Sequence, residues 1–404
     1  MGSALWAGIS GLNASAKQLD VVANNLANVN TLGFKGDMTF FADVLSSSIS
    51  GGSSGTLQVG RGVAVAEVQT SFASGSFETT GNATDAAIDG DGFFMVNDNE
   101  GATYYTRAGA FHLNADGVLV DINGYYLQGQ MFREDGSLSA LGNITLTGLQ
   151  SEPQMTTRYS LGANLNSQTA EGDTYTTTQS IYDSLGAVHT FETLFTKTAN
   201  VNEWTVTFSL DGDPVASTVP ASVVFEFDSG GAMMTPTNVT ITMPPLGTGA
   251  TIDPVTWDMT SQQALAITQY ASASVIRATT SDGYTSGNLK SLAIDPSGII
   301  SGFFTNGQTS ELAQIILAAF PNPWALNKLG SNLFGETVMS GSSVRNIPGA
   351  SGMGTLTPNT LEMSNTDIAT EFIRMITAQK AYQANAKVIT TEDTLMQVLM
   401  NIKQ

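Results

Sequence analysis

Few side chains in this sequence are of the kinds that catalyse reactions or bind metal ions. The chain has 404 residues, no Cys and only two histidines, His112 and His189, which lie far apart in the sequence. Each falls in a segment with strand character, where a single His is more often structural than catalytic. The sequence has no phosphate-binding loop, serine nucleophile elbow, His-Glu-x-x-His motif or Cys/His cluster. We therefore predict no catalytic residue, no metal site, no cofactor and no enzymatic activity.

One acidic motif resembles the start of a calcium-binding loop. Asp89 and Asp91 are separated by Gly90 and followed by Gly92. A calcium loop needs further oxygen ligands close by, but here the chain continues into the apolar residues 93–96. We interpret the motif as a tight turn ahead of a buried strand.

The chain is sparsely charged but strongly acidic in sum. Charged residues make up 12% of the sequence and the net charge is −20, which argues against nucleic acid as a partner, because phosphate binding needs a basic face. The two ends of the chain are nearly neutral, so most of the negative charge lies between them. No apolar run reaches the roughly 18 residues of a membrane span, and the first basic residue is Lys17. We expect no membrane insertion and no cleavable signal peptide.

The C-terminal segment has the pattern of a long amphipathic helix. No Pro or Gly occurs between Asn365 and Gln404, and a helix over 366–404 would be roughly 57 Å long. Its apolar or small positions follow steps of four and three, with polar Gln379 and Asp393 filling two places in that frame, and this spacing predicts a coiled coil. The apolar or small positions are Ile368, Phe372, Met375, Tyr382, Ala386, Ile389, Met396 and Met400.

A second helix with the same periodicity is predicted at the N-terminus. Ser3 is its expected N-cap, and Gly8 and Gly11 each weaken it by about 1 kcal/mol. Its apolar and small positions repeat over three heptads: Leu5, Ile9, Leu12, Ala16, Leu19, Ala23 and Leu26. This segment alone would equally suit a helix on the core of an ordinary domain. Since both ends carry heptads and the middle does not, we predict that the two helices pair and that the rest is inserted between them.

The middle of the chain has the pattern of short strands and turns. Residues 37–62 are rich in Ser and Gly and predict an extended, mobile connector. From Val63 onward, short apolar runs alternate with Asp-Gly and Asn-Gly hairpin signals. The spacing of strands in 150–285 predicts a β-sandwich or barrel, and the apolar run from Leu312 to Phe320 suits either a core strand or a buried helix.

The predicted fold is therefore mainly β, with nested β domains between N- and C-terminal heptad helices that form a coiled coil. We divide the chain into four parts: a terminal coiled coil (1–28 and 366–404), an extended connector (29–70 and 356–365), a β-rich middle domain (71–148 and 285–355), and an inserted outer β-barrel or sandwich (149–284).

Several motifs resemble those of the bacterial flagellar rod and hook protein family. The N-terminal motif runs from Asn24 to Lys35 and includes Asn25, Asn28, Gly33 and Phe34. The segments 90–96, 105–111 and 113–120 resemble shared β motifs of the family. At the C-terminal end the match continues with Leu361, Glu362, Ser364 and Asn365 and with 378–385 and 388–391. The insertion at about 150–284 and the segments 182–189, 306–309 and 320–323 resemble hook members of the family in particular.

The resemblance implies a subunit of the flagellar hook, a curved flexible tube that joins rod to filament as a universal joint and transmits motor torque. It implies self-association into a helical polymer, with the distal rod, hook cap, hook–filament junction proteins and flagellar type III export apparatus as further partners. It also implies an extracellular location in the hook, reached without a cleaved signal peptide. The nearest alternative is a distal rod subunit, and a more distant one is a secreted β-rich carbohydrate-binding protein or enzyme.

The residues by themselves favour assembly as well. Head-to-tail contacts between copies build an open helix, and a terminal helix pair buries its remaining apolar surface only against neighbouring copies. We predict that residues 1–30 and 361–404 are largely disordered in the free monomer and fold on assembly.

Overall fold

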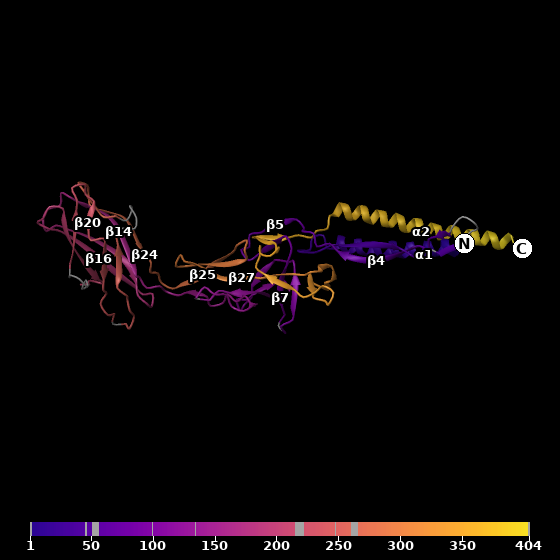
Figure 1. The fold of residues 1–404 in the computed structure, drawn as a ribbon, viewed down its shortest axis with the longest axis horizontal. Coiled ribbons are helices and arrows are strands. Elements are labelled where there is room, and N and C mark those ends of the chain that lie inside the picture. The colour runs from indigo at the N-terminus through magenta and orange to yellow at the C-terminus, as the bar shows by residue number, and fades with distance from the viewer. Residues whose placement is uncertain are drawn as a thin grey trace. The chain divides into compact units, whose positions relative to one another are not determined.

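The structure is a computed structural model that describes residues 2–44, 47–50, 56–98, 100–133, 135–214, 222–246, 248–259 and 266–402 (Figure 1). The chain forms two compact units. Unit 1 contains residues 1–148, 291–302 and 311–404, and unit 2 contains residues 149–290 and 303–310. The predicted fold class is confirmed: the chain is mainly β, between an N-terminal and a C-terminal helix.

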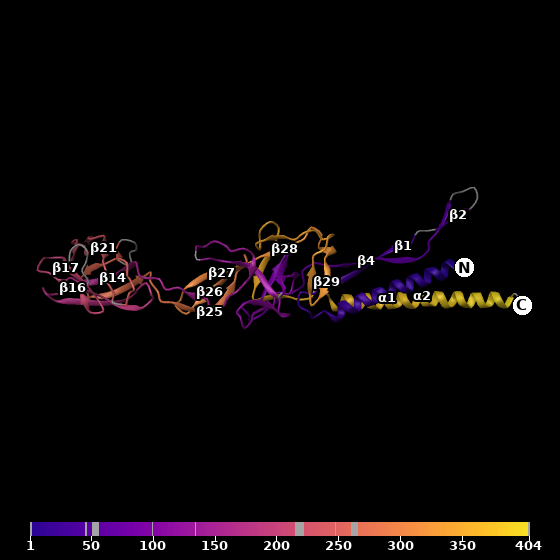
Figure 2. The same ribbon diagram turned by 90° about the horizontal axis from the view of Figure 1, so that it is seen from below.

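The two terminal helices lie side by side in unit 1 (Figures 1 and 2). Helix α1 spans Gly2–Ala27 and helix α2 spans Ile368–Ile402. The predicted pairing of the chain ends is therefore observed. No helix in the described residues is both long and apolar enough to cross a membrane.

The connector after α1 is extended, as predicted, but it is also paired. Strands β1 (Asp37–Asp43) and β4 (Val63–Thr70) form an antiparallel ribbon that packs on α1, and β2 (Ser47–Ser50) pairs with β3 (Thr56–Val59). The backbone N–H of Val63 donates to the Ser10 hydroxyl at 3.2 Å. The β pattern from Val63 onward predicts β4, whereas the Ser- and Gly-rich composition of residues 37–62 as a whole gives no indication of β1, β2 and β3.

The rest of unit 1 is built around a sheet of short strands. The main sheet contains β27 (Thr309–Ile315), β11 (Tyr126–Met131), β7 (Phe93–Asn97), β8 (Thr103–Thr106), β30 (Leu333–Gly335) and β29 (Asn327–Gly330) in that order. The pairs β27–β11, β11–β7, β7–β8, β8–β30 and β30–β29 are antiparallel. Attached to it are β9 (Phe111–Leu113), β10 (Leu119–Asp121), β12 (Gly142–Asn143), β28 (Leu317–Ala319) and β31 (Val344–Asn346). Two further pairs are β5 (Phe77–Thr79) with β33 (Thr360–Glu362) and β6 (Ala86–Asp89) with β32 (Thr355–Pro358). The apolar run 312–320 is thus strand and not helix.

An aromatic cluster forms one core of unit 1. Phe93 meets Phe72, Phe320 and Phe334 with ring centroids 5.5–6.0 Å apart, and the Tyr105 ring lies edge-on to Phe320 at 4.7 Å. The motif at Asp89–Asp91 is a turn, with Gly90 at φ +111° and Gly92 at φ +131°. The chain then enters the buried strand β7.

Unit 2 consists of two sheets around one core. The first holds β14 (Arg158–Asn166), β21 (Asn238–Ile241), β22 (Val255–Asp258), β23 (Thr268–Tyr270) and β24 (Val275–Ser281). The second holds β15 (Thr174–Tyr182), β16 (Val188–Lys197), β17 (Glu203–Leu210), β18 (Asp213–Pro214), β19 (Val223–Phe227) and β20 (Met233–Thr235). Strands β13 (Gln150–Ser151), β25 (Gly287–Ile294) and β26 (Ile299–Phe304) belong to the sheet that also contains β27.

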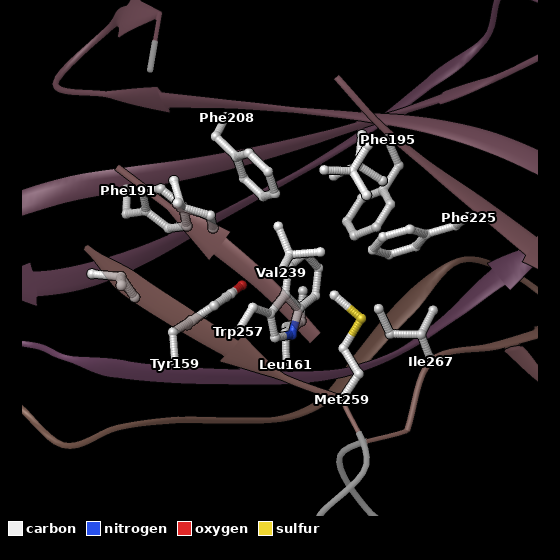
Figure 3. Packing of buried hydrophobic residues seen from close by; sticks show 14 of the residues in the cluster. Tyr159, Leu161, Phe191, Phe195, Phe208, Phe225, Val239, Trp257, Met259 and Ile267 are labelled. Atoms are coloured by element: carbon white, nitrogen blue, oxygen red, sulfur yellow. The ribbon is translucent and has the colours of Figure 1, made fainter. Parts of the chain in front are cut away.

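The core of unit 2 follows from the alternation of its strands. In β17 every second side chain is buried, beginning with Trp204. Trp257 from the first sheet lies 5.5 Å from Phe225 and 5.9 Å from Phe208 of the second, measured between ring centroids (Figure 3). Fully burying side chains of this size contributes about 1.5–3 kcal/mol each, so the two sheets are joined by an ordinary hydrophobic core.

Candidate assembly site: the terminal helices and their junction

The contact between α1 and α2 is made through small residues. A Cβ added at Gly8 would lie 3.1 Å from Ile389 Cγ1, and one added at Gly11 would lie 2.7 Å from Asn385 Nδ2. The buried positions of α1 follow the same face: Gly8, Gly11, Ala14, Ser15, Val22 and Asn25. The two glycines that weaken α1 as an isolated helix therefore allow α2 to approach closely.

The predicted heptad residues border this contact and do not fill it. In α1, Leu5, Leu12, Leu19 and Leu26 are half-buried and Ile9 is exposed. In α2, Met375 and Ile389 are half-buried, whereas Ile368, Phe372, Tyr382, Met396 and Met400 are exposed.

Helix α2 also carries many exposed apolar side chains. Phe372 is 47% exposed and Ile376 is 54% exposed. We call the exposed apolar residues of this helix the open surface of α2: Ile368, Phe372, Ile373, Ile376, Tyr382, Val388, Leu395, Met396, Val398 and Met400. Exposed apolar residues in this number along one helix indicate an interaction site.

Hydrogen bonds of side-chain amides hold the turn that follows α1. The Asn25 amide donates to the Asp37 carbonyl at 2.8 Å, and Asn25 Oδ1 accepts from the Asp37 N–H at 2.9 Å. Asn28 Nδ2 donates to the carbonyl of Asn24 at 2.9 Å. Gly33 has φ +65°, and a Cβ there would lie 2.6 Å from the Ala108 nitrogen. Only glycine fits this position, because of both its backbone conformation and the close approach.

A buried ionic cluster joins the two chain ends to the β core. Lys35 Nζ lies 2.6 Å from Glu362 Oε1, and Arg107 Nη1 lies 3.5 Å from Glu362 Oε2. All three side chains are buried. Lys35 Nζ also donates to the Ala73 carbonyl at 2.9 Å, and the Gly75 N–H donates to Glu362 Oε1 at 2.9 Å. Burial lowers the pKa of Lys35, against the opposing effect of Glu362, and the nearby Arg107 charge lowers that pKa further.

The segment that leads into α2 is hydrogen-bonded to residues that follow α1. Asn365 Oδ1 accepts from the Gly36 N–H at 2.8 Å, and its amide donates to the Ser71 carbonyl at 2.8 Å. The Ser364 and Thr366 hydroxyls are hydrogen-bonded at 2.8 Å. Asp367 caps the helix by accepting from the Thr370 N–H at 2.7 Å, and hydrogen bonds from the Thr370 side chain and backbone lower the pKa of Asp367.

A hairpin formed by β29 and β30 holds the turn after α1 from another side. Lys328 Nζ contacts Asp37 Oδ1 at 2.6 Å and lies 5.6 Å from the centre of the Phe34 ring. The Asn332 amide donates to the Leu32 carbonyl at 2.7 Å. Leu361 is half-buried in β33, opposite Glu78 of β5. The motif residues at both ends of the sequence thus meet in one place, which we call the junction.

Sequence reasoning missed Arg107 and Lys328 as members of the junction. Arg107 lies in the segment 105–111, which resembles a motif of the family. It is the one charged residue of that segment, and this was the available signal. Lys328 lies in the part of the chain assigned only to the β-rich middle domain (285–355), and nothing in its sequence neighbourhood indicates a partner.

The two histidines lie apart from the junction. His189 of unit 2 has Nδ1 2.7 Å from Asp211 Oδ2 and Nε2 3.3 Å from Asp183 Oδ2. His112 is an exposed residue of β9. Within the described ranges no group of three or more His, Cys, Asp or Glu side chains is arranged to bind a metal ion.

Four family models match successive parts of the chain. They are described as flagella basal body rod protein (residues 5–35), flagellar hook protein FlgE/F/G D1 domain (87–161), flagellar basal body protein FlaE D2 domain (130–284) and flagellar basal body rod FlgEFG protein C-terminal (357–402). The first and last of these contain the residues of the terminal helices, and the D2 model spans the insertion.

Relatives match over nearly the whole chain. The flagellar hook protein FlgE of Borreliella burgdorferi is 34% identical over 445 residues, covering 99% of both chains. That of Salmonella typhimurium is 34% identical over 415 residues, covering 98% of both. A crystal structure of Helicobacter pylori flagellar hook protein FlgE2 matches 71% of this chain and 100% of its own, with 15% identity and a TM-score of 0.49.

Proposed function

The chain belongs to the FlgE family of flagellar hook proteins and is a hook subunit, and we propose that it polymerises through its paired terminal helices. The observation that supports this most directly is the open surface of α2, where Phe372 is 47% and Ile376 is 54% exposed. Neighbouring copies would cover it, together with the flanking heptad residues of α1. Each large apolar side chain buried in this way contributes about 1.5–3 kcal/mol.

In this proposal the chain divides into the four parts expected from the sequence. The coiled coil of 1–28 and 366–404 forms the inner part of the tube. The connector (29–70 and 356–365) leads to the middle domain (71–148 and 285–355) and the outer insertion (149–284). The junction would transmit load between the helices and the β core, because its buried charge-assisted hydrogen bonds resist separation.

The β domains would supply the flexibility of a universal joint. With 12% charged residues and many Ser, Thr and Gly, their outer surfaces suit weak, hydrated contacts that can slide as the tube bends. The tube would couple rod to filament and transmit motor torque. The distal rod, hook cap, hook–filament junction proteins and type III export apparatus are the proposed partners, with export to the cell exterior without a cleaved signal peptide.

A double substitution in the open surface of α2 tests the polymerisation step. We expect Phe372→Ser with Ile376→Ser to abolish tube formation, because both side chains are exposed in the single chain and their loss removes only contacts between copies. Sedimentation and electron microscopy of the purified protein measure it. Val201→Ser is the matched control, since Val201 is an 88% exposed apolar residue of unit 2. Normal tubes from the double variant would sink the proposal.

A further inference from the structure

The motif at 182–189 closes on itself in unit 2 through its second and last residues. His189 Nε2 lies 3.3 Å from Asp183 Oδ2. The other ring nitrogen, Nδ1, lies 2.7 Å from Oδ2 of Asp211, the residue that follows β17. Among the described residues these two carboxylates are the ion-pair partners of His189. On the neighbouring strand β15 the residue paired with His189 is the apolar Ile181.

This geometry requires a histidine ring that is protonated on both nitrogens. An ionised carboxylate only accepts hydrogen bonds, so both ring nitrogens must carry a hydrogen to bond Asp211 and Asp183 at once. A neutral imidazole carries only one such hydrogen. Loss of the proton therefore removes one of the two bonds, and the bond to Asp183 is the longer one. Burial lowers the pKa of His189, but the hydrogen bonds to Asp211 and Asp183 outweigh this and the net pKa is raised above 6.5.

Asp183 depends on the protonated ring more than Asp211 does. Asp183 is 1% exposed, whereas half of the Asp211 side chain is in contact with solvent. Asp183 Oδ1 accepts from the N–H groups of Leu185 at 2.9 Å and Ala187 at 2.8 Å, and its Oδ2 faces His189 Nε2. With a neutral ring, Oδ2 would face the lone pair of a ring nitrogen. A buried carboxylate that loses its partner destabilises whatever it holds.

The turn that Asp183 holds lies against both ends of the longer chain segment of unit 2. Gly186 has φ +80°, and a Cβ there would lie 2.6 Å from Pro153 Cβ and 3.4 Å from the Ser286 nitrogen. The Tyr182 N–H donates to Thr156 Oγ1 at 2.9 Å, and the Thr156 N–H donates to the Tyr182 carbonyl at 2.9 Å. The turn thus supports the strands by which the chain enters and leaves this segment.

We propose that the motif 182–189 is a proton-controlled latch, which holds the turn 183–187 against Pro153 and Thr156 when His189 is protonated and releases it when His189 is neutral. The latch is closed below pH 6.5 and opens as pH rises through the raised pKa of His189. It lies within unit 2 and operates in the free subunit, so it stands or falls independently of the proposed polymerisation. It also gives a role to a motif that the assembly site does not use.

Amide hydrogen exchange of the free, full-length subunit tests the latch, with each rate divided by the intrinsic rate at the same pH. We expect the protection of the Leu185, Ala187 and Thr156 amides to fall as pH rises above 6.5. The fall should be about tenfold or more, as for the loss of one hydrogen bond to a charged group. His189→Gln should abolish this dependence. His112→Gln, which replaces the other histidine of the sequence, is the matched control and should leave it intact.

Protection that is independent of pH in the unsubstituted subunit overturns the proposal, and so does a fall that persists in the His189→Gln variant.

Asp183→Asn gives a second measurement, with the opposite sign. The amide oxygen introduced at this position can still accept from the N–H groups of Leu185 and Ala187. The amide nitrogen takes the place of Oδ2 and donates to the neutral ring, but it cannot accept from the protonated one. The protection of the turn should therefore rise with pH in this variant. A profile that falls or stays flat contradicts the latch.

Discussion

At the scale of single residues, Glu362 is the most connected group of the junction. It faces two buried cations, Lys35 and Arg107, and accepts from the Gly75 N–H. A buried ion pair is weak support for stability by itself, but removing one member leaves an uncompensated buried charge. The loss of Glu362 would therefore cost more stability, by leaving two buried cations without a counter-charge, than the intact ion pair contributes in net energy.

We expect Glu362→Gln to destabilise the subunit by about 3–5 kcal/mol, because both cations would remain buried without a counter-charge. Denaturant unfolding of the free subunit measures the change. Glu78→Gln is the control, since Glu78 is exposed in the paired strand β5, and it should shift the free energy of unfolding by less than about 0.5 kcal/mol. Equal effects of the two substitutions would refute the role given to Glu362.

His189 gives unit 2 a dependence on pH. Burial lowers its pKa, but the hydrogen bonds to Asp211 and Asp183 outweigh this, and the net pKa is raised above its ordinary value of 6.5. A raised pKa in the folded state means that the stabilisation is complete below the unfolded value and is lost as pH rises through the folded one. We expect the melting temperature of unit 2 to fall as pH rises above 6.5 and through the raised pKa of His189.

His189→Gln should remove this part of the pH dependence, as seen by thermal unfolding at a series of pH values. The carboxylates of Asp183 and Asp211 affect the stability of unit 2 at acid pH instead. Burial raises the pKa of Asp183, but hydrogen bonds from backbone N–H groups and from His189 outweigh it and the net pKa is lowered. The hydrogen bond from His189 lowers the pKa of Asp211. The contribution of both carboxylates is therefore lost only in acid. A melting curve of the variant that still declines over the same neutral range would rule out His189 as the cause.

At the scale of elements, the helix pair depends on residues that a helix by itself disfavours. Glycine costs about 1 kcal/mol relative to alanine in a helix, yet a Cβ at Gly11 would lie 2.7 Å from Asn385 Nδ2. The close approach of α1 and α2 thus decides the residue type against local propensity.

We expect Gly11→Ala to lower the dissociation temperature of the polymer, because an overpacking cost of about 1–3 kcal/mol exceeds the gain in propensity. Asn13→Ala, at an exposed position of α1, should not lower it. Adding Asn385→Ala to Gly11→Ala should restore part of the loss, because it removes the atoms that the new Cβ meets. A rise in dissociation temperature for Gly11→Ala alone would disprove the tight contact.

At the scale of the whole molecule, the junction limits which parts of the chain can be disordered before assembly. The sequence predicts disorder over 1–30 and 361–404 in the free monomer. The bonds of Asn25 to Asp37 and of Glu362 to Lys35 tie the inner ends of these segments to the β core. We therefore limit the predicted disorder of the free monomer to the residues before Asn25 and the residues after Asp367.

Trypsin distinguishes these parts. In the free subunit we expect cleavage after Lys17, Lys380 and Lys387 to precede cleavage after the buried Lys35. In the polymer the helix sites should be protected, because copies cover them. Helix sites that resist trypsin as long as Lys35 in the free subunit would contradict folding on assembly.

The sequence by itself determined the order of the elements and the identity of the family. Heptads at Leu5–Leu26 and Ile368–Met400, a β-rich middle and the motifs at 24–35 and 361–365 were readable because periodicity and turn residues are local properties. The sequence also indicated both helices and the division of the chain between them. It left β1 of the β1–β4 ribbon unassigned, because this strand lies in a segment (37–62) that is rich in Ser and Gly as a whole, and its pairing with β4 is a tertiary contact.

Only the tertiary structure decided which surfaces meet. A stripe of apolar residues shows that a helix needs a partner, but not which face that partner covers, and here Gly8 and Gly11 admit α2 while Phe372 and Ile376 stay exposed. Lys35 and Glu362 are 327 residues apart in sequence and 2.6 Å apart in space. Such a pair is invisible to any local pattern, since its energy comes from burial and proximity that exist only once the chain has folded.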